Sequence, residues 1–217
     1  MFKRRFIQPE LLDHLPPDEA RPNLEDLTRI NARFGGHSVV KRVLQRVIPR
    51  TDSFTLLDIG SASGDAARVI RELYPRAAVT NLDCNAVNME KAHHPKLIAD
   101  AFQLPFPEES FDYVFCSLLL HHFTDDQVVV LVKSFYRLAR KALLVCDLER
   151  HFIPYLFLPA TRPFFRWHFA TVHDGVISIR AAFVREELQG LFVRAGIRNA
   201  QVEAHRPAFR LTAIAAK

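Results

Sequence analysis

The chain has 217 residues, of which 49% are hydrophobic and 24% charged, and its formal net charge at pH 7 is +5. This composition is typical of one globular domain with a substantial core, and it excludes a disordered or fibrous protein. Three widely spaced cysteines, with no CxxC pair or Cys/His cluster, argue against disulfides and structural zinc and favour a reducing, cytoplasmic location.

No apolar run approaches the roughly 20 residues of a membrane span, and no signal peptide is expected. Charge is unevenly distributed along the chain. Residues 1–50 hold 10 basic and 6 acidic side chains, residues 51–147 hold 9 and 13, and residues 148–217 hold 10 and 5. The basic flanks are either ordinary solvated surface or the lining of an entrance for an anionic or lipid-like acceptor, with peripheral membrane contact as one form of it.

We expect one domain that spans residues 1–217. The pattern of residues 1–50 predicts that they form a helical cap on it. A short helix is expected at Pro9–Leu12, stopped by Pro16 and Pro17. A second helix is expected from Asn23, and a third from Ser38 to Ile48, where Pro49 closes it.

Residues 51–147 alternate between apolar runs that end in a polar residue and helical patterns. Helices are expected at Asp65–Tyr74, after Asn85 as an N-cap, and after a capping box at Thr124–Gln127. The alternation predicts an α/β fold with a parallel sheet whose ligands lie at the carboxyl ends of the strands. The expected strands are Thr55–Ile59, Ala77–Leu82, Lys96–Ala99, Phe111–Ser117 and Ala142–Cys146.

Residues 148–182 form an aromatic-rich insertion that breaks this alternation. It is either a buried irregular segment or a lid and acceptor pocket for an apolar, aromatic molecule. Residues 183–217 predict a final helix, Val184–Ala195, and a strand hairpin that turns at Arg206-Pro207. The aromatic residues of the insertion are Phe152, Tyr155, Phe157, Phe164, Phe165, Trp167 and Phe169.

The stretch Leu56–Arg68 predicts a strand, a turn of small residues and a helix start. Small residues allow a ligand to approach the backbone, and the first N–H groups of a helix favour electronegative groups. Asp83 ends the next strand, where a carboxylate can accept protons from ribose hydroxyls. Asp100 ends the third strand, where it can bind the amine of adenine.

Four segments in this order resemble the motifs of class I S-adenosylmethionine-dependent methyltransferases: LLDIGSASGD (56–65), NLDC (81–84), ADAFQLPFPEESFDYV (99–114) and LLLHHF (118–123). The resemblance implies a Rossmann-like, seven-stranded, mostly parallel sheet that binds S-adenosyl-L-methionine. It places Asp58, Gly60, Ser61, Ala62 and Gly64 around the methionine part, Asp83 and Cys84 at the ribose, and Asp100, Ala101 and Phe102 at the adenine, with Ser117 also in the cofactor site. Ala62 stands where the family's pattern has its middle glycine.

A narrower resemblance extends over nearly the whole chain. FIQPELLD (6–13), RINARFGG (29–36), CSLLLHHF (116–123), VCDLER (145–150) and SIRAAF (178–183) are similar to bacterial methyltransferases associated with type III polyketide synthases. This resemblance implies a lipophilic, phenol-like acceptor of polyketide origin and a functional link to such a synthase.

An unperturbed phenol has a pKa near 10, so a positioned base would assist its methylation at neutral pH. His121 and His122 follow the fourth expected strand, and we expect one of them to act as a base or orienting group; alternatively, the pair packs or caps the next helix. Further candidates for the acceptor pocket are Arg29, Trp167, His173 and Arg180. No carboxylate–histidine spacing requires a metal.

Methyl transfer to a phenolic hydroxyl is therefore the leading prediction. C-methylation of a quinone precursor remains an alternative, as does a non-catalytic module that binds the cofactor and regulates a biosynthetic enzyme. A nucleic-acid methyltransferase is disfavoured because the chain has no Asn/Asp-Pro-Pro-Tyr motif and no basic run. A nicotinamide-dependent dehydrogenase is also less favoured.

Overall fold

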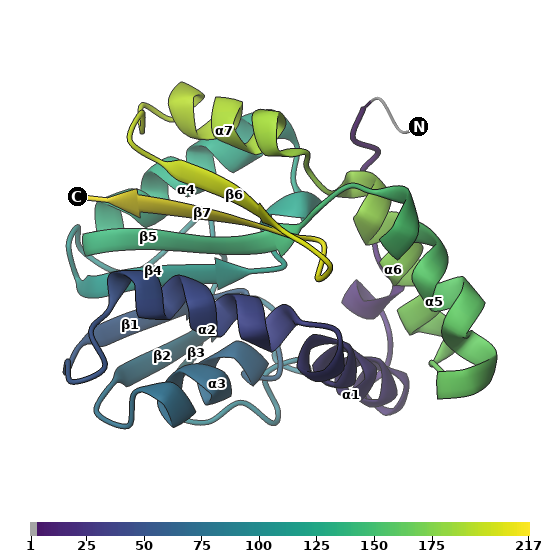
Figure 1. The fold of residues 1–217 in the computed structure, drawn as a ribbon. Coiled ribbons are helices and arrows are strands. Elements are labelled where there is room, and N and C mark those ends of the chain that lie inside the picture. The colour runs from purple at the N-terminus through teal and green to yellow at the C-terminus, as the bar shows by residue number, and fades with distance from the viewer. Residues whose placement is uncertain (1–3) are drawn as a thin grey trace.

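The computed structural model describes residues 4–217. Within them, seven strands form one sheet in the order β3-β2-β1-β4-β5-β7-β6 (Figure 1). The first five strands in this order pair in parallel, whereas β7 is antiparallel to both β5 and β6. The predicted mostly parallel α/β sheet is confirmed. Its strands are β1 (Thr55–Ile59), β2 (Ala78–Asp83), β3 (Lys96–Ile98), β4 (Phe111–Ser117), β5 (Ala139–Leu148), β6 (Gln201–His205) and β7 (Arg210–Ala216).

Helices cover both faces of the sheet because side chains alternate between the faces along each buried strand. Leu57 packs with α4 (Asp125–Leu138) and α7 (Arg185–Arg194) on one face. Leu56 packs with α2 (Gly36–Val47) and α3 (Asp65–Leu73) on the other. The core therefore consists of two apolar layers separated by the sheet.

The N-terminal elements differ from the prediction. The first expected helix is only a 3₁₀ turn, η1 (Leu11–Asp13), and α1 (Pro17–Arg33) begins six residues before Asn23. Pro17 starts this helix instead of stopping the previous one, because the first helical position needs no backbone N–H donor. The helix expected after Asn85 is a turn, in which the Asn85 side chain accepts a hydrogen bond from the Val87 N–H.

The insertion is helical, so the first of its two readings, a buried irregular segment, is wrong: it forms α5 (Phe152–Phe165) and α6 (Phe169–Ala181). α5 lies at the outer edge of the molecule, beyond α6 (Figure 1). α5 contains Pro159 and Pro163, and proline usually interrupts a helix. Close packing against α6 compensates for the backbone bonds that they remove, since a Cβ on Gly175 would lie 2.2 Å from Leu158 Cδ1.

No helix among residues 4–217 is both long enough and apolar enough to cross a bilayer.

The capping box at the start of α4 allows a direct test of local stability. The Thr124 side chain accepts from the Gln127 N–H, and the Gln127 side chain accepts from the Thr124 N–H. Thr124→Ala should lower the free energy of unfolding by about 1 kcal/mol, measured by urea denaturation. Thr124→Ser keeps the oxygen and should recover most of this loss. Equal destabilisation by both variants would show that the cap does not stabilise the helix.

Candidate functional site

A cavity of about 870 Å³ lies at the carboxyl ends of β1, β2, β4 and β5. One part of its wall is the loop between β1 and α3 with the ends of the neighbouring strands, and the other is formed by α1, α5 and α6. The position matches the sheet edge where parallel α/β proteins bind ligands.

The β1–α3 loop has a backbone that only small residues adopt easily. Gly60 and Gly64 have φ values of 72° and 73°, and a Cβ on Gly60 would lie 2.8 Å from Leu119 Cδ1. The Asp83 carboxylate fixes the loop by accepting from the Ala62 N–H at 2.9 Å. The loop is therefore preformed.

Ala62, which departs from the family's glycine pattern, has a packing role. It adopts the left-handed region with φ 44° and packs against a small apolar cluster of Leu12, Ala20 and Leu24. Its methyl group thus joins the cofactor-type loop to the N-terminal cap, which explains why a side chain is kept where the backbone favours glycine.

Asp58 is the most unusual carboxyl group of the cavity wall. It is buried, and among residues 4–217 its Oδ2 has no hydrogen-bond partner. Burial, together with the negative charge of Asp83, raises the pKa of Asp58 to about 8. The positive charge of Arg71 offsets these effects only in part. A buried carboxyl group with one unbonded oxygen, beside a preformed loop, is suited to a ligand that carries positive charge.

Most of the residues predicted from sequence to bind a cofactor lie together. The cavity is lined by Asp58, Gly60, Ser61, Ala62, Asp83, Cys84 and Ser117, while Gly64 lines a second pocket next to it. The predicted adenine residues lie outside both. Asp100 is exposed and accepts from the Phe102 N–H, and Phe102 contacts the ring of Phe123, which does line the cavity.

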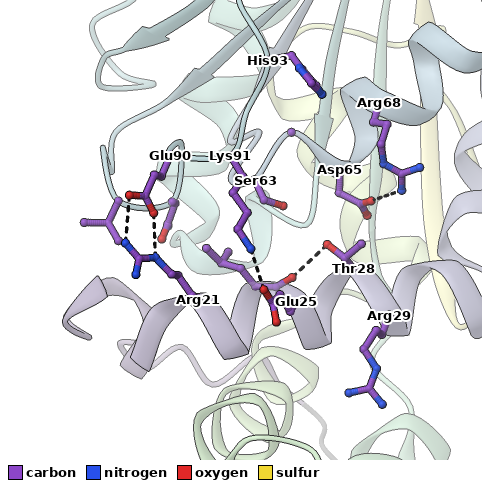
Figure 2. Close-up of a pocket in the computed structure, with 14 residues that line it drawn as sticks. Arg21, Glu25, Thr28, Arg29, Ser63, Asp65, Arg68, Glu90, Lys91 and His93 are labelled. Atoms are coloured by element: carbon purple, nitrogen blue, oxygen red, sulfur yellow. Dashed lines mark hydrogen bonds and ion pairs between the residues drawn. The ribbon is translucent and has the colours of Figure 1, made fainter. Parts of the chain in front are cut away.

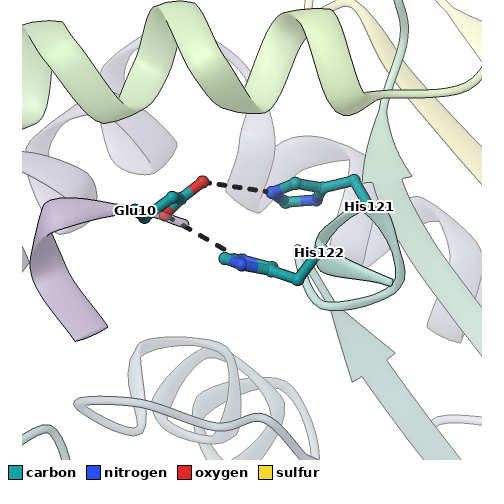
Figure 3. A group of neighbouring side chains, drawn as sticks. All are labelled: Glu10, His121 and His122. Carbon is teal, nitrogen blue, oxygen red and sulfur yellow. Dashed lines mark ion pairs between the residues drawn. The ribbon is translucent and has the colours of Figure 1, made fainter. Parts of the chain in front are cut away.

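His121 lies between two carboxylates that are far apart in the sequence, Asp147 and Glu10, and Figure 3 shows its contact with Glu10. Its Nδ1 lies 2.6 Å from Asp147 Oδ1, and its Nε2 lies 3.7 Å from Glu10 Oε1. The same Glu10 carboxylate lies 3.9 Å from His122 Nε2 and accepts from the Ser178 hydroxyl. His121 is only 3% exposed, so water contributes little to this arrangement.

The two carboxylates determine the charge of His121. Burial alone would lower the pKa of His121, but the charge and hydrogen bond of Asp147, reinforced by Glu10, outweigh burial and raise the pKa to about 9. Burial likewise opposes the charged form of Glu10, yet the bonded imidazoles hold the pKa of Glu10 below its usual value. The resting site is therefore an imidazolium between two carboxylates.

Glu10 is positioned by an N-terminal segment that is bonded along its length. Arg5 donates to Ala181 O at 2.7 Å and to Phe123 O at 2.8 Å. Leu11 and Leu12 donate their backbone N–H groups to the Asp174 carboxylate of α6. These contacts place residues 5–12 across the mouth of the His121 site.

The sequence prediction did not include Glu10 or Asp147 in the site. Asp147 carried a usable signal, because it directly follows an expected strand in the same way as Asp83 and Asp100. No spacing in the sequence links Glu10 to the site, because 111 positions separate it from His121. The same separation explains why the sequence shows no metal-ligand spacing here. In the structure, one ligand atom from each of Glu10, His121 and His122 lies within 4.8 Å of the others, so these three side chains could hold a divalent ion.

None of the four predicted acceptor residues lines the larger cavity. Trp167 is buried and stacks on Phe165, and the Arg29 guanidinium lies 4.8 Å from the centre of the Trp167 ring. His173 is exposed, and Arg180 lies over the ring of Phe6. The apolar wall comes instead from Leu27, Ile30, Phe34, Ile153, Phe157, Leu158, Ile179 and Phe209.

A second pocket of about 420 Å³ lies between α1 and the cofactor-type loop (Figure 2). It includes Arg29, Gly64 and two ion pairs that connect α1 to the turn after β2. Arg21 Nε lies 2.9 Å from Glu90 Oε2, and Lys91 Nζ lies 2.7 Å from Glu25 Oε1. These pairs hold α1 against the loop.

Comparison with known proteins agrees with this geometry. Residues 57–145 match the family described as "Methyltransferase domain". The plantazolicin methyltransferase BpumL in complex with SAH superposes with a TM-score of 0.69 at 13% identity, covering 95% of this chain and 92% of that one. The chain has the class I methyltransferase fold.

Two curated relatives match only the central part. A demethylmenaquinone methyltransferase of Thermotoga maritima is 27% identical over 95 residues, which are 42% of this chain and 41% of that protein. Malonyl-[acyl-carrier protein] O-methyltransferase 1 of Coxiella burnetii is 28% identical over 94 residues, 41% of this chain and 33% of that protein. The chain thus matches less than half the length of either relative. These findings support S-adenosyl-L-methionine as the cofactor, and the preformed loop and the unpaired Asp58 fit its cationic methionine end.

The charge of His121 should be visible in the stability of the protein. Its pKa is raised on folding from about 6.5 to about 9, so its contribution is complete below pH 6.5 and is lost as pH rises through 9. The difference in unfolding free energy between wild type and His121→Gln should be largest near pH 6, up to about 3 kcal/mol, and should shrink towards pH 9.5. Chemical denaturation across this range measures it, with His173→Gln as an exposed control. A difference that does not change with pH would contradict the charged network.

Proposed function

We propose that this protein transfers a methyl group from S-adenosyl-L-methionine to a hydroxyl group of a lipophilic, phenol-like acceptor. The observation that carries the proposal is that one cavity holds the cofactor-type loop, a buried histidine–carboxylate pair and a mainly apolar wall. The link to a product of a type III polyketide synthase rests on the resemblance of the sequence segments alone.

The cofactor supplies an activated methyl group on a sulfonium, so the protein mainly has to bind and orient the reactants. Asp58 and the β1–α3 loop would hold the methionine end. Asp83 and Cys84 would face the ribose. Phe123, which lies beside Phe102, would face the adenine.

The proton of the acceptor would go to His121. Its Nδ1 is held by Asp147, so the acceptor would meet Nε2, which lies 3.7 Å from Glu10 Oε1 in the cavity wall that both residues line. With the methyl donor bound, Nε2 would take the hydroxyl proton as the acceptor oxygen is methylated. The His121 pKa of about 9 lies close to that of a phenol, near 10, so the proton transfer is almost balanced in free energy. Only the neutral form of the imidazole can accept this proton.

The rate of the proposed methyl transfer should therefore rise with pH. In wild type, kcat/KM should increase up to an inflection near pH 9 as His121 loses its proton. Glu10→Gln removes one of the two carboxylates that raise this pKa, so the inflection should move to lower pH. Glu186→Gln, on the distant helix α7, should leave the inflection in place. Loss of rate in Glu10→Gln without a shifted inflection would assign Glu10 a purely structural role.

Cofactor binding should release a proton. With a pKa of about 8, Asp58 is largely protonated at pH 7, and a cationic ligand beside it should lower this pKa. Titration calorimetry with S-adenosyl-L-methionine in two buffers of different ionisation enthalpy should show release of close to one proton at pH 7. Asp58→Asn should abolish the release, whereas the exposed Asp126→Asn should preserve it. Identical enthalpies in both buffers for wild type would exclude Asp58 from the cofactor site.

The proposed function itself is tested by incubating the protein with deuterium-labelled methyl donor and long-chain alkyl phenols. Mass fragmentation of the product distinguishes the two positions of transfer, because a label on oxygen gives a methyl ether and a label on carbon gives a ring-methylated phenol. C-methylation of a quinone precursor is the second candidate, supported by the similarity to the demethylmenaquinone methyltransferase. Cofactor binding without transfer to either class would favour a non-catalytic role.

A further inference from the structure

Helix α5 exposes a row of apolar side chains on its outer side, where the only ring contact among the described residues is that of Phe152 with His151. Phe152, Leu156, Ala160 and Phe164 follow one another at intervals of four residues, which places them on one side of the helix, and all four are exposed. Leu156 is 54% exposed and Phe164 is 83% exposed. Ile153, next to this row, is exposed as well. A cluster of large exposed apolar side chains of this kind marks an interaction surface.

The charge around this face has one sign. No aspartate or glutamate occurs between Glu149 and Asp174, a stretch that contains the whole of α5. Arg162 and Arg166 are exposed at the C-terminal end of the helix, and neither takes part in an ion pair in the part of the chain that the structure describes. An apolar face bordered by unpaired arginines, without acidic side chains, is complementary to an anionic lipid surface.

The same helix forms part of the cavity wall. Pro154, Phe157 and Leu158 line the cavity, and Ile153 both lines it and is exposed on the outer face. Helix α5 therefore separates its outer face from the cavity that His121 also lines. The helix has 14 residues, which is too short to span a bilayer but long enough to lie in its surface.

We propose that α5 is an interfacial helix with which this protein rests on an anionic lipid bilayer, and that lipophilic acceptors enter the cavity from the bilayer past Ile153. The route of the acceptor rests on the proposed function, whereas the lipid contact does not. Methyl transfer is therefore not needed as a readout, and failure of one proposal can be distinguished from failure of the other.

The test is flotation of the full chain with vesicles of phosphatidylcholine alone or of phosphatidylcholine with one third phosphatidylglycerol. Wild type should bind the anionic vesicles and should be released by high salt. Leu156→Ser/Phe164→Ser should lower the vesicle partition coefficient by about tenfold or more, since both side chains would leave the lipid. Arg162→Ser/Arg166→Ser should lower it by a similar factor on anionic vesicles only.

Matched controls come from the opposite side of the molecule. Val130 on α4 and Val193 on α7 are 57% and 46% exposed, so Val130→Ser/Val193→Ser removes exposed apolar side chains away from α5 and should leave vesicle binding unchanged. Thermal unfolding of each variant shows that it is folded. Equal binding by the α5 variants and wild type would overturn the proposal. The proposal would also be overturned if light scattering showed that the wild type is a dimer and that the α5 substitutions dissociate it. The apolar face of α5 would then bind a second copy of the chain.

Discussion

A buried positive charge between two carboxylates is the interaction on which the rest of this site depends. His121 follows β4, and Asp147 lies near the end of β5. Glu10 belongs to the N-terminal segment, which comes before all the helices in the sequence. Removing either acid would leave a buried ion with half its compensation, which is costly in a protein interior. The network therefore fixes the protonation state of the imidazole and also the position of the chain segment that covers it.

The second constraint is the coupling between the cofactor-type loop and the cap. The methyl group of Ala62 packs into the apolar cluster of the cap, and the ion pairs of Arg21 and Lys91 connect α1 to the turn after β2. One side of the cavity is thus set by the sheet and the other by α1, α5 and α6. The sheet side therefore carries the preformed loop and the strand-end carboxylates, and the helical side carries most of the large apolar side chains of the cavity wall.

The sequence predicted the sheet well because its strands are buried on both faces and end in acids or small residues at the ligand edge. The β1–α3 loop and Asp83 were found for the same reason, since local pattern and tertiary position agree there. Trp167 and Arg180 show the opposite case. Both have chemistry suited to a pocket, but Trp167 is stacked on Phe165 and Arg180 lies over Phe6, and neither contact follows from spacing. Glu10 could not be placed because nothing local links it to a histidine pair far along the chain.

The position of Glu10 also bears on the order in which the molecule is completed. The parallel and antiparallel pairings of the sheet join residues such as Leu56 with Tyr113 and Ala142 with Ala216, which are 57 and 74 positions apart. The contacts that close the His121 site join residues 116 positions apart for Arg5 and His121, and 168 apart for Glu10 and Ser178. Loop-closure entropy grows with this separation. A chain can therefore finish its sheet while the imidazole still has one carboxylate. The last contacts of the His121 site would then form when the N-terminal segment docks, and not when the core forms.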